Sequence, residues 1–203
     1  MIGWGIAAAL LISGCGGSHK ASTTNSTTAQ PSSTPAPSPP PSGIRGRLLT
    51  NNELASFQSV RMNVFSNPSG WLAAAQGGTP HQLAAEKAML THNGFRAGAR
   101  EDLTNGGTPG LSIVEQFQSP QTARVALAFY DALNKSGAGG GFKSFSVHGV
   151  PGAQGLTDVN NSGVNIAFSD GPYYYLVGRE GGGAAAIAAL NSAAVHLYHR
   201  VHS

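Results

Sequence analysis

Residues 164–178 read VNIAFSDGPYYYLVG, and this stretch contains the strongest signal for the fold. Apolar side chains recur at every second position on both sides of Asp170-Gly171, which is typical of two half-buried strands joined by a tight turn. The turn predicts a register with Phe168 opposite Tyr173, which places the apolar side chains of both strands on one face. Pro172 cannot donate a ladder hydrogen bond, so we expect a four-residue loop.

The same alternation sends Tyr174 and Leu176 to the second face of this hairpin, away from Tyr173 and Tyr175. Two interpretations are open. Helices from the N-terminal half bury the pair, or the face is left uncovered and the pair forms a surface for an apolar or glycan ligand. Tyr174 and Leu176 are therefore the candidate ligand-contacting residues.

Two further hairpin strands precede this one in the chain. Residues 95–103 and 111–118 both alternate, with Leu111, Ile113, Glu115 and Phe117 on one side of the second, and Asn105-Gly106-Gly107 predicts a turn between them. We also expect strands over residues 145–150 and 153–157.

Helical periodicity and capping signals predict the remaining elements. The pair Thr50 and Glu53 fits a capping box and predicts a short helix over 51–58, and Thr79-Pro80 predicts a helix over 80–92. A helical turn is expected over 69–76, and longer amphipathic helices over 120–135 and 184–201. Together the elements predict an α+β domain in which an antiparallel sheet of five or six strands carries helices on one face.

The N-terminus has the pattern of an export signal. Residues 2–12 are an apolar run too short to span a bilayer, which needs about 20 residues. The run ends in Ile12-Ser13-Gly14-Cys15, which resembles the lipobox of bacterial lipoproteins. That resemblance implies a signal peptide over 1–14, lipidation of Cys15 and attachment to the cell membrane on its extracytoplasmic side. The alternative is a free cysteine beside an uncleaved anchor.

A spacer follows the cysteine. Eighteen of the 28 residues from Gly16 to Gly43 are Ser, Thr or Pro, a composition that cannot build a packed core. We expect residues 15–43 to form a disordered tether and residues 44–203 a single globular domain, monomeric in solution.

The order of elements carries a second resemblance. A helix, two strands, a helix that begins at Ser119-Pro120, further strands and a closing helix follow the lipobox and the spacer. This arrangement resembles exported actinobacterial lipoproteins of the LpqN-like group, which have a PsbP-like α/β/α sandwich. The resemblance covers about residues 95–201 and implies a cell-envelope protein that binds or assists other components, without implying catalytic residues.

Composition excludes several classes of function. Charged residues make up 10% of the chain, against about 25% in ordinary soluble domains, and the net charge is +3. A nucleic-acid partner is therefore not expected, because it would require clustered Lys and Arg. The single cysteine excludes an intrachain disulfide. No nucleotide-binding, zinc-protease or serine-hydrolase motif occurs, and we expect no cofactor.

Two alternatives to a non-enzymatic binding module follow from histidines. His148 lies at a predicted strand end, and a pair with Asp158 or Asp170 would suit an exported hydrolase. His196, His199 and His202 recur every three residues on the last helix, a spacing that would suit weak capture of a metal ion. A solvated helix end is the other interpretation of these three histidines.

Overall fold

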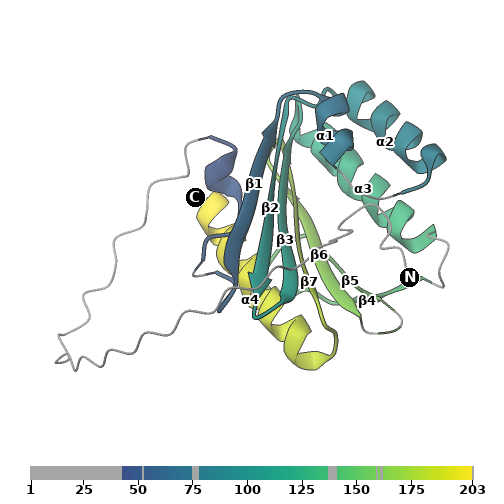
Figure 1. Cartoon of the computed structure of the whole chain (residues 1–203). Helices are drawn as coiled ribbons and strands as arrows, with labels where there is room; N and C mark the ends of the chain where they lie inside the picture. Colours follow the sequence, from purple (N-terminus) through teal and green to yellow (C-terminus); the bar gives the residue numbers. More distant parts are fainter. Residues whose placement is uncertain are drawn as a thin grey trace.

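The computed structural model describes residues 43–51, 53–74, 78–136, 141–158, 160 and 162–202. Its centre is one antiparallel sheet of seven strands in the order β1-β2-β3-β7-β6-β5-β4. Helix α4 (Ala184–Val201) covers one face of the sheet, and helices α1 (Pro68–Ala74), α2 (Pro80–His92) and α3 (Pro120–Ser136) lie on the other (Figure 1). The α+β class is confirmed.

Two details of the predicted architecture are wrong. The sheet has seven strands where five or six were expected, because both edge strands were misjudged. Helices also cover both faces, where one covered face was expected. The buried residues accordingly form two clusters, one beneath α4 and one beneath α1–α3, and the sheet separates them.

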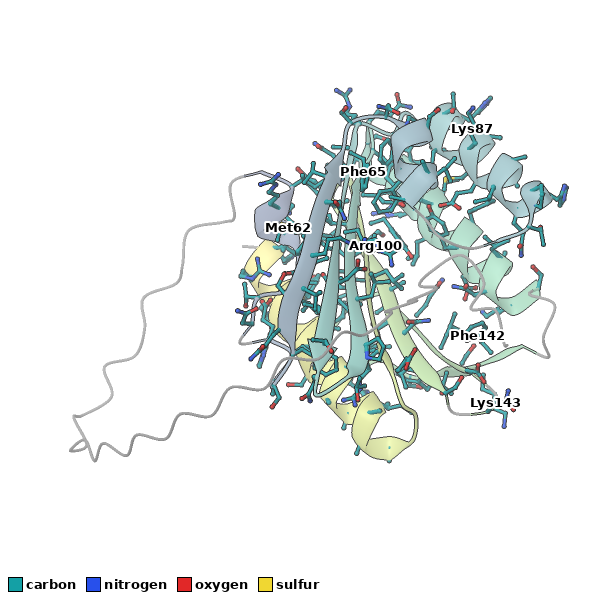
Figure 2. All side chains as sticks on the ribbon, viewed as in Figure 1. Met62, Phe65, Lys87, Arg100, Phe142 and Lys143 are labelled. Carbon is teal, nitrogen blue, oxygen red and sulfur yellow. The ribbon has the colours of Figure 1, made fainter. Side chains whose placement is uncertain are left out.

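The edge strand β1 (Gln58–Phe65) was missed. The helix predicted over 51–58 is absent, since residue 51 and residues 53–56 form turns and a bend, and the backbone N–H of Thr50 donates to Glu53 Oε2 without a helix following. Val60, Met62 and Val64 alternate as a strand should, but their side chains are 56%, 41% and 39% exposed. Met62 lies on this outer strand in Figure 2. The alternation of these three apolar residues therefore marks the exposed side of the strand and not a side that packs in the core.

The opposite edge strand, β4 (Phe142–Phe145), begins three residues before the predicted strand 145–150 and overlaps it only at Phe145; residues 146–150 form irregular chain and a bend. Its neighbour β5 (Gln154–Asp158) follows the prediction closely. Phe142 pairs with Asp158 and Phe145 with Gly155. A side chain on Gly155 would collide with the Phe145 ring at 2.5 Å, so glycine is required for this close approach.

The β2–β3 hairpin is confirmed. Strand β2 (Ala97–Asn105) pairs with β3 (Thr108–Gln116) through a two-residue turn at Gly106 and Gly107, both with positive φ. The turn closes with Asn105 opposite Thr108, so these two glycines set the register of the hairpin.

The β6–β7 hairpin forms with a tighter turn than expected. Strands β6 (Gly163–Asp170) and β7 (Tyr173–Glu180) pair Asp170 with Tyr173, so the loop contains only Gly171 and Pro172. Phe168 therefore lies opposite Tyr175 and not Tyr173. The shift is two residues, an even number, so the face of every side chain is unchanged. The rings of Phe168 and Tyr175 stack with centroids 4.7 Å apart.

The first core lies between the sheet and α4. Leu190, Ala194, Leu197 and Val201 of the predicted helical stripe are buried. Residues 43–51 and 53–57, including the short 3-10 helix η1 (Arg45–Arg47), pack on this same face. Arg200 of α4 holds this segment in place by donating hydrogen bonds to both carboxylate oxygens of Glu53 and to the carbonyls of Gly46 and Leu48.

The second core lies beneath α1–α3 and holds the cavity described below. Helix α2 begins at a full capping box in which Thr79 and Gln82 exchange hydrogen bonds, as predicted. Helix α3 buries Ala123, Ala126 and Tyr130 against β6 and β7. Among the described residues, no helix is both long and apolar enough to cross a membrane. Cys15 and the predicted tether lie outside the described residues.

Candidate functional site

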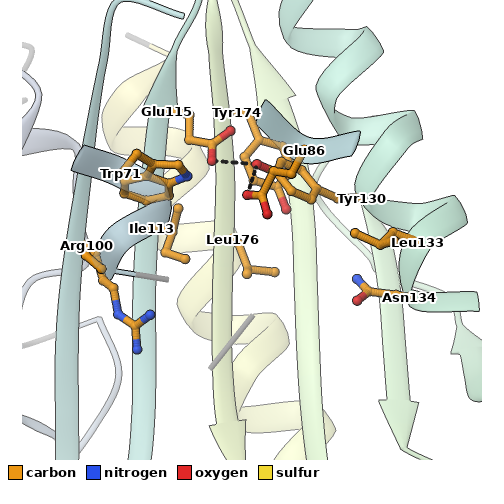
Figure 3. A pocket seen from close by; sticks show the side chains of 11 residues that line it. Trp71, Glu86, Arg100, Ile113, Glu115, Tyr130, Leu133, Asn134, Tyr174 and Leu176 are labelled. Atoms are coloured by element: carbon orange, nitrogen blue, oxygen red, sulfur yellow. Dashed lines mark hydrogen bonds between the residues drawn. The ribbon is translucent and has the colours of Figure 1, made fainter. Parts of the chain in front are cut away.

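A small cavity opens between α1–α3 and the sheet, and we call it the carboxyl cavity. Its volume is about 30 Å³, which is room for about two waters. Strands β2, β3 and β7 supply its floor, and the three helices supply its walls (Figure 3). The lining residues are Trp71, Ala74, Glu86, Arg100, Ile113, Glu115, Tyr130, Leu133, Asn134, Tyr174 and Leu176.

Two carboxyl groups and one tyrosine hydroxyl meet at this cavity. The hydroxyl oxygen of Tyr130 lies 2.9 Å from Glu86 Oε1 and 2.8 Å from Glu115 Oε1 (Figure 3). All three side chains are buried. A tyrosine hydroxyl carries one proton, so it donates to one carboxylate and accepts from the other carboxyl group. The two contacts therefore require that one of the two glutamates is protonated.

Burial also favours the protonated forms. Loss of water raises the pKa of Glu86 to about 7, against smaller lowering contributions from Tyr130 and Trp71. The pKa of Glu115 is raised well above its usual range, first by complete burial and then by the charge of Glu86. The same burial raises the pKa values of Tyr130 and Tyr174, which stay neutral. The carboxyl cavity thus contains two acids that keep their protons to a higher pH than exposed glutamates do, and a compensating positive charge would favour their ionisation.

Three polar atoms of this cluster have no hydrogen-bond partner. They are Glu86 Oε2, Glu115 Oε2 and the indole nitrogen Nε1 of Trp71. The Trp71 N–H is near enough to both carboxyls to lower their pKa values, but it meets neither in good hydrogen-bond geometry. Buried polar groups are paired in the great majority of cases. Three unpaired atoms at one cavity indicate a place for an additional polar group.

Arg100 lies at the other end of the cavity, where its guanidinium points away from the two glutamates (Figure 3). Its Nε donates to Asp102 Oδ1 at 2.8 Å, and both side chains are buried. Arg61 approaches the other oxygen of Asp102 from the exposed strand β1. Arg100 and Arg61 thus share one aspartate, and the negative charge that the carboxyl cavity can develop comes from Glu86 and Glu115.

A second cavity adjoins the first, and we call it the adjoining cavity. Its volume is about 10 Å³, and it shares Tyr130, Asn134, Tyr174 and Leu176 with the carboxyl cavity. Asp131, Gln154 and Asn165 add polar groups to it, and Asp131 Oδ1 has no partner. Tyr174 and Leu176 therefore form the floor common to both cavities.

A larger hollow among the described residues lies elsewhere and has a different character. It is an open groove of about 480 Å³ beside the β6–β7 turn, lined among others by Arg124, Asp170 and Tyr198. No residue of its lining has a buried polar atom without a partner. It therefore lacks the feature that distinguishes the carboxyl cavity.

Comparison with known structures identifies the fold. The chain is similar to the crystal structure of the extracellular domain of PknH from Mycobacterium tuberculosis, with a TM-score of 0.51 and 14% identity. The match covers 79% of this chain and 95% of that domain. At this identity the likeness shows the fold alone. No protein-family model matches the sequence, and no curated protein matches it.

The sequence-predicted site residues fall in three places. Tyr174 and Leu176 lie on the second sheet face as expected, buried at 3% exposure beneath the helices and on the floor of the cavities. Whether they contact a ligand stays a prediction. Cys15 is outside the described residues.

The predicted pairing of His148 with a carboxylate does not form. His148 is exposed, and its backbone is held by the Asn191 side chain of α4. Asp158 accepts hydrogen bonds from the backbone of Asn160 and from Ser162, and Asp170 pairs with His202 at 2.7 Å. The three histidines of α4 are exposed and do not gather. Within the described part of the chain, no three His, Cys, Asp or Glu side chains are placed to hold a metal ion.

Sequence reasoning missed Trp71, Glu86, Glu115 and Tyr130 as a cluster. A signal was present at two positions. Glu115 stands in the alternating set with Leu111, Ile113 and Phe117, so it is a carboxyl on an apolar strand face. Glu86 precedes Met89 and Leu90 by three and four residues, on the buried side of α2. An acid in a buried stripe is uncommon unless paired and marks a candidate site.

Proposed function

We propose that the protein is a membrane-anchored binding module of the cell envelope that holds a small polar ligand in the carboxyl cavity and the adjoining cavity. The observation that carries the proposal is the set of three unpaired polar atoms, Glu86 Oε2, Glu115 Oε2 and Trp71 Nε1. Each unpaired buried polar group costs about 1–3 kcal/mol. A ligand that pairs with them recovers that cost.

The lining favours a polar ligand over the apolar or glycan ligands considered from the sequence. Two carboxyls, an indole N–H and a tyrosine hydroxyl lie beside a space of about 30 Å³, which favours a small group. A larger molecule would insert one end, and its remainder would extend past Asn134 and Leu176 toward the adjoining cavity. The confined space and the closed hydroxyl–carboxyl contacts favour binding over turnover of a substrate.

The lipobox and the PknH likeness support an extracytoplasmic location. An envelope lipoprotein would carry its lipid on Cys15, and the structural neighbour is an extracellular domain. The described chain starts beside α4, on the sheet face opposite the carboxyl cavity (Figure 1). A tether attached there would leave the cavity side unobstructed.

Native mass spectrometry of the chain purified from its host tests the ligand. We expect a retained small molecule, which Ala74→Leu displaces because residue 74 lines the carboxyl cavity. Ala73→Leu is the matched control, since Ala73 is exposed on the same helix. An unliganded mass for the wild type, together with no response to small polar probes, would overturn the binding function.

The anchor is tested separately by Cys15→Ser. We expect the wild type to sediment with membranes and the variant to be released into the soluble fraction. Mass spectrometry of the N-terminal peptide should show an acylated Cys15 in the wild type. Equal membrane association of both forms would contradict lipid anchoring and leave the binding function untouched.

A further inference from the structure

At the carboxyl cavity, hydrogen-bond acceptors without a donor include an oxygen of each of the two carboxyl groups. Glu86 Oε2 and Glu115 Oε2 are acceptors without donors, and the donors beside them that have no partner among the described residues are Trp71 Nε1 and the hydroxyl of Tyr174. Both glutamates already share the hydroxyl of Tyr130 through their other oxygens. The group that complements this set presents several donors within a small volume. An ammonium has three donors and no acceptor.

The walls of the cavity suit a cation. Trp71, Tyr130 and Tyr174 line it with aromatic rings, and such rings attract ammonium groups through their negative faces. The Tyr130 and Tyr174 rings lie with centroids 4.9 Å apart and are tilted by 34°. Rings of this kind offer no hydrogen-bond donor to an anion other than the Trp71 N–H and the tyrosine hydroxyls.

The charge and the size of the cavity limit the kinds of ligand that it can bind. The Arg100 guanidinium pairs with Asp102 and points away from the two glutamates (Figure 3), so it does not reach the carboxyl end of the cavity, where an anionic ligand would need it. A calcium ion takes six to eight oxygen ligands, more than two carboxyls and one hydroxyl provide. A volume of about 30 Å³ favours a small primary ammonium such as methylammonium over a bulkier quaternary ammonium.

We propose that the carboxyl cavity binds a protonated primary amine, which donates to Glu86 and Glu115 while lying against Trp71, Tyr130 and Tyr174. This inference rests on the proposed function, because it names the ligand class of the same cavity. The amine is the bound end of the ligand, whether the whole ligand is a small molecule or the exposed amine of a larger one.

Proton release accompanies this binding. The cation compensates the negative charge of the two glutamates, so one that was protonated in the empty cavity ionises and gives its proton to solvent. The other groups facing the pair are Tyr130, Tyr174, the Arg100–Asp102 pair and, from the adjoining cavity, Asp131 with Lys135. Of these, the tyrosines stay neutral and the others are paired. Affinity for the amine therefore rises from pH 6 to pH 8.

Calorimetric titration of the full chain in a non-ionic detergent tests the proposal with methylammonium chloride as the probe. Methanol, sodium acetate and potassium chloride are the control ligands, because each resembles methylammonium in size or in carrying a single charge. NaCl keeps the ionic strength constant in all titrations. We expect methylammonium to bind at least tenfold more tightly than methanol, with no detectable binding of acetate or potassium. Repeating the titration in buffers of different ionisation enthalpy should show a proton released on binding.

Three isosteric variants make the test specific. Glu115→Gln and Glu86→Gln should each weaken methylammonium binding at least tenfold. Both remove a buried acid and keep its shape, so folding is expected to be preserved. Glu101→Gln is the control, because Glu101 is also buried on β2 with a raised pKa but lies on the opposite sheet face, beside Ser112. It should bind like the wild type.

The outcomes separate the two proposals. The amine assignment is overturned if methanol, acetate or potassium binds as tightly as methylammonium, or if Glu115→Gln binds methylammonium as the wild type does. The binding function still stands in that case if any of these probes shifts the indole NMR signal of Trp71. If none of the four probes binds and the chain purified from its host has the mass of the protein without a ligand, both the amine assignment and the binding function are overturned.

Discussion

The hydroxyl oxygen of Tyr130 lies 2.8 Å from Oε1 of Glu115, and both side chains are buried in the second core. The same oxygen lies 2.9 Å from Glu86 Oε1. One proton on the hydroxyl cannot serve two carboxylates, so the cluster holds a further proton at one glutamate. Helices α2 and α3 and strand β3 thus meet at a group of three side chains that share protons.

Glutamine at position 86 should remove a pH dependence of stability. Burial raises the pKa of Glu86 from 4.5 to about 7. Between these values the folded chain holds a proton that the unfolded chain has released, so the free energy of unfolding falls as the pH rises. Urea unfolding at pH 5 and pH 8 should show the wild type losing about 2–3 kcal/mol more than Glu86→Gln. Identical pH profiles for the two proteins would contradict this.

Phenylalanine at position 130 should destabilise the domain. Tyr130→Phe removes the only hydroxyl that pairs with Glu86 Oε1 and Glu115 Oε1, and leaves both buried oxygens without a partner. We expect a loss of about 2 kcal/mol in urea unfolding. Tyr174→Phe is the matched control on the same cavity, because its hydroxyl makes no hydrogen bond among the described residues. Equal effects of the two substitutions would argue against the Tyr130 bridge.

Alanine at position 98 should displace Trp71. Gly98 lies opposite Glu115 in the β2–β3 pair, and a Cβ there would lie 2.7 Å from Trp71 Cε3 and 2.9 Å from Cζ3. The ring is held by Phe65 and Phe95, so it has little room to retreat. We expect Gly98→Ala to cost about 1–3 kcal/mol and to shift the Trp71 indole NMR signal. Gly70→Ala, where the nearest atom is 3.5 Å away, should do neither.

Lysine at position 200 should loosen the start of the domain. The Arg200 guanidinium donates to Glu53 Oε1 at 2.7 Å, to Glu53 Oε2 at 2.8 Å and to the carbonyl of Leu48 at 2.6 Å. A lysine amine cannot reproduce this planar arrangement. We expect Arg200→Lys to cost about 2 kcal/mol.

Amide hydrogen exchange locates that effect, with faster exchange expected over residues 46–57. Lys135→Ala serves as the control, because its ion pair with Asp131 is an exposed i,i+4 contact worth less than about 0.5 kcal/mol. Unchanged exchange over 46–57 in Arg200→Lys would mean that other contacts hold this segment to α4.

Sequence patterns predicted the elements whose signals are local. The glycines at 106 and 107 placed one hairpin, the stripes of α3 and α4 predicted their buried sides, and alternation sent Tyr174 and Leu176 to the second face. Patterns failed where the environment departs from the usual rule. Strand β1 turns its apolar residues to solvent, and the capping pair Thr50 and Glu53 is followed by turns that end at Ser56, with a positive φ of 68°.

Alternation and helical period by themselves determined which face of its own element each side chain occupies, Glu115 and Tyr130 included, because those periods are properties of the local backbone. Tertiary structure alone decided that helices cover both faces of the sheet. It also decided that Tyr130 meets Glu115 fifteen residues before it and Glu86 forty-four before it. That meeting depends on how α2 and α3 cross the sheet, an arrangement set by packing between elements that no single stretch of sequence encodes.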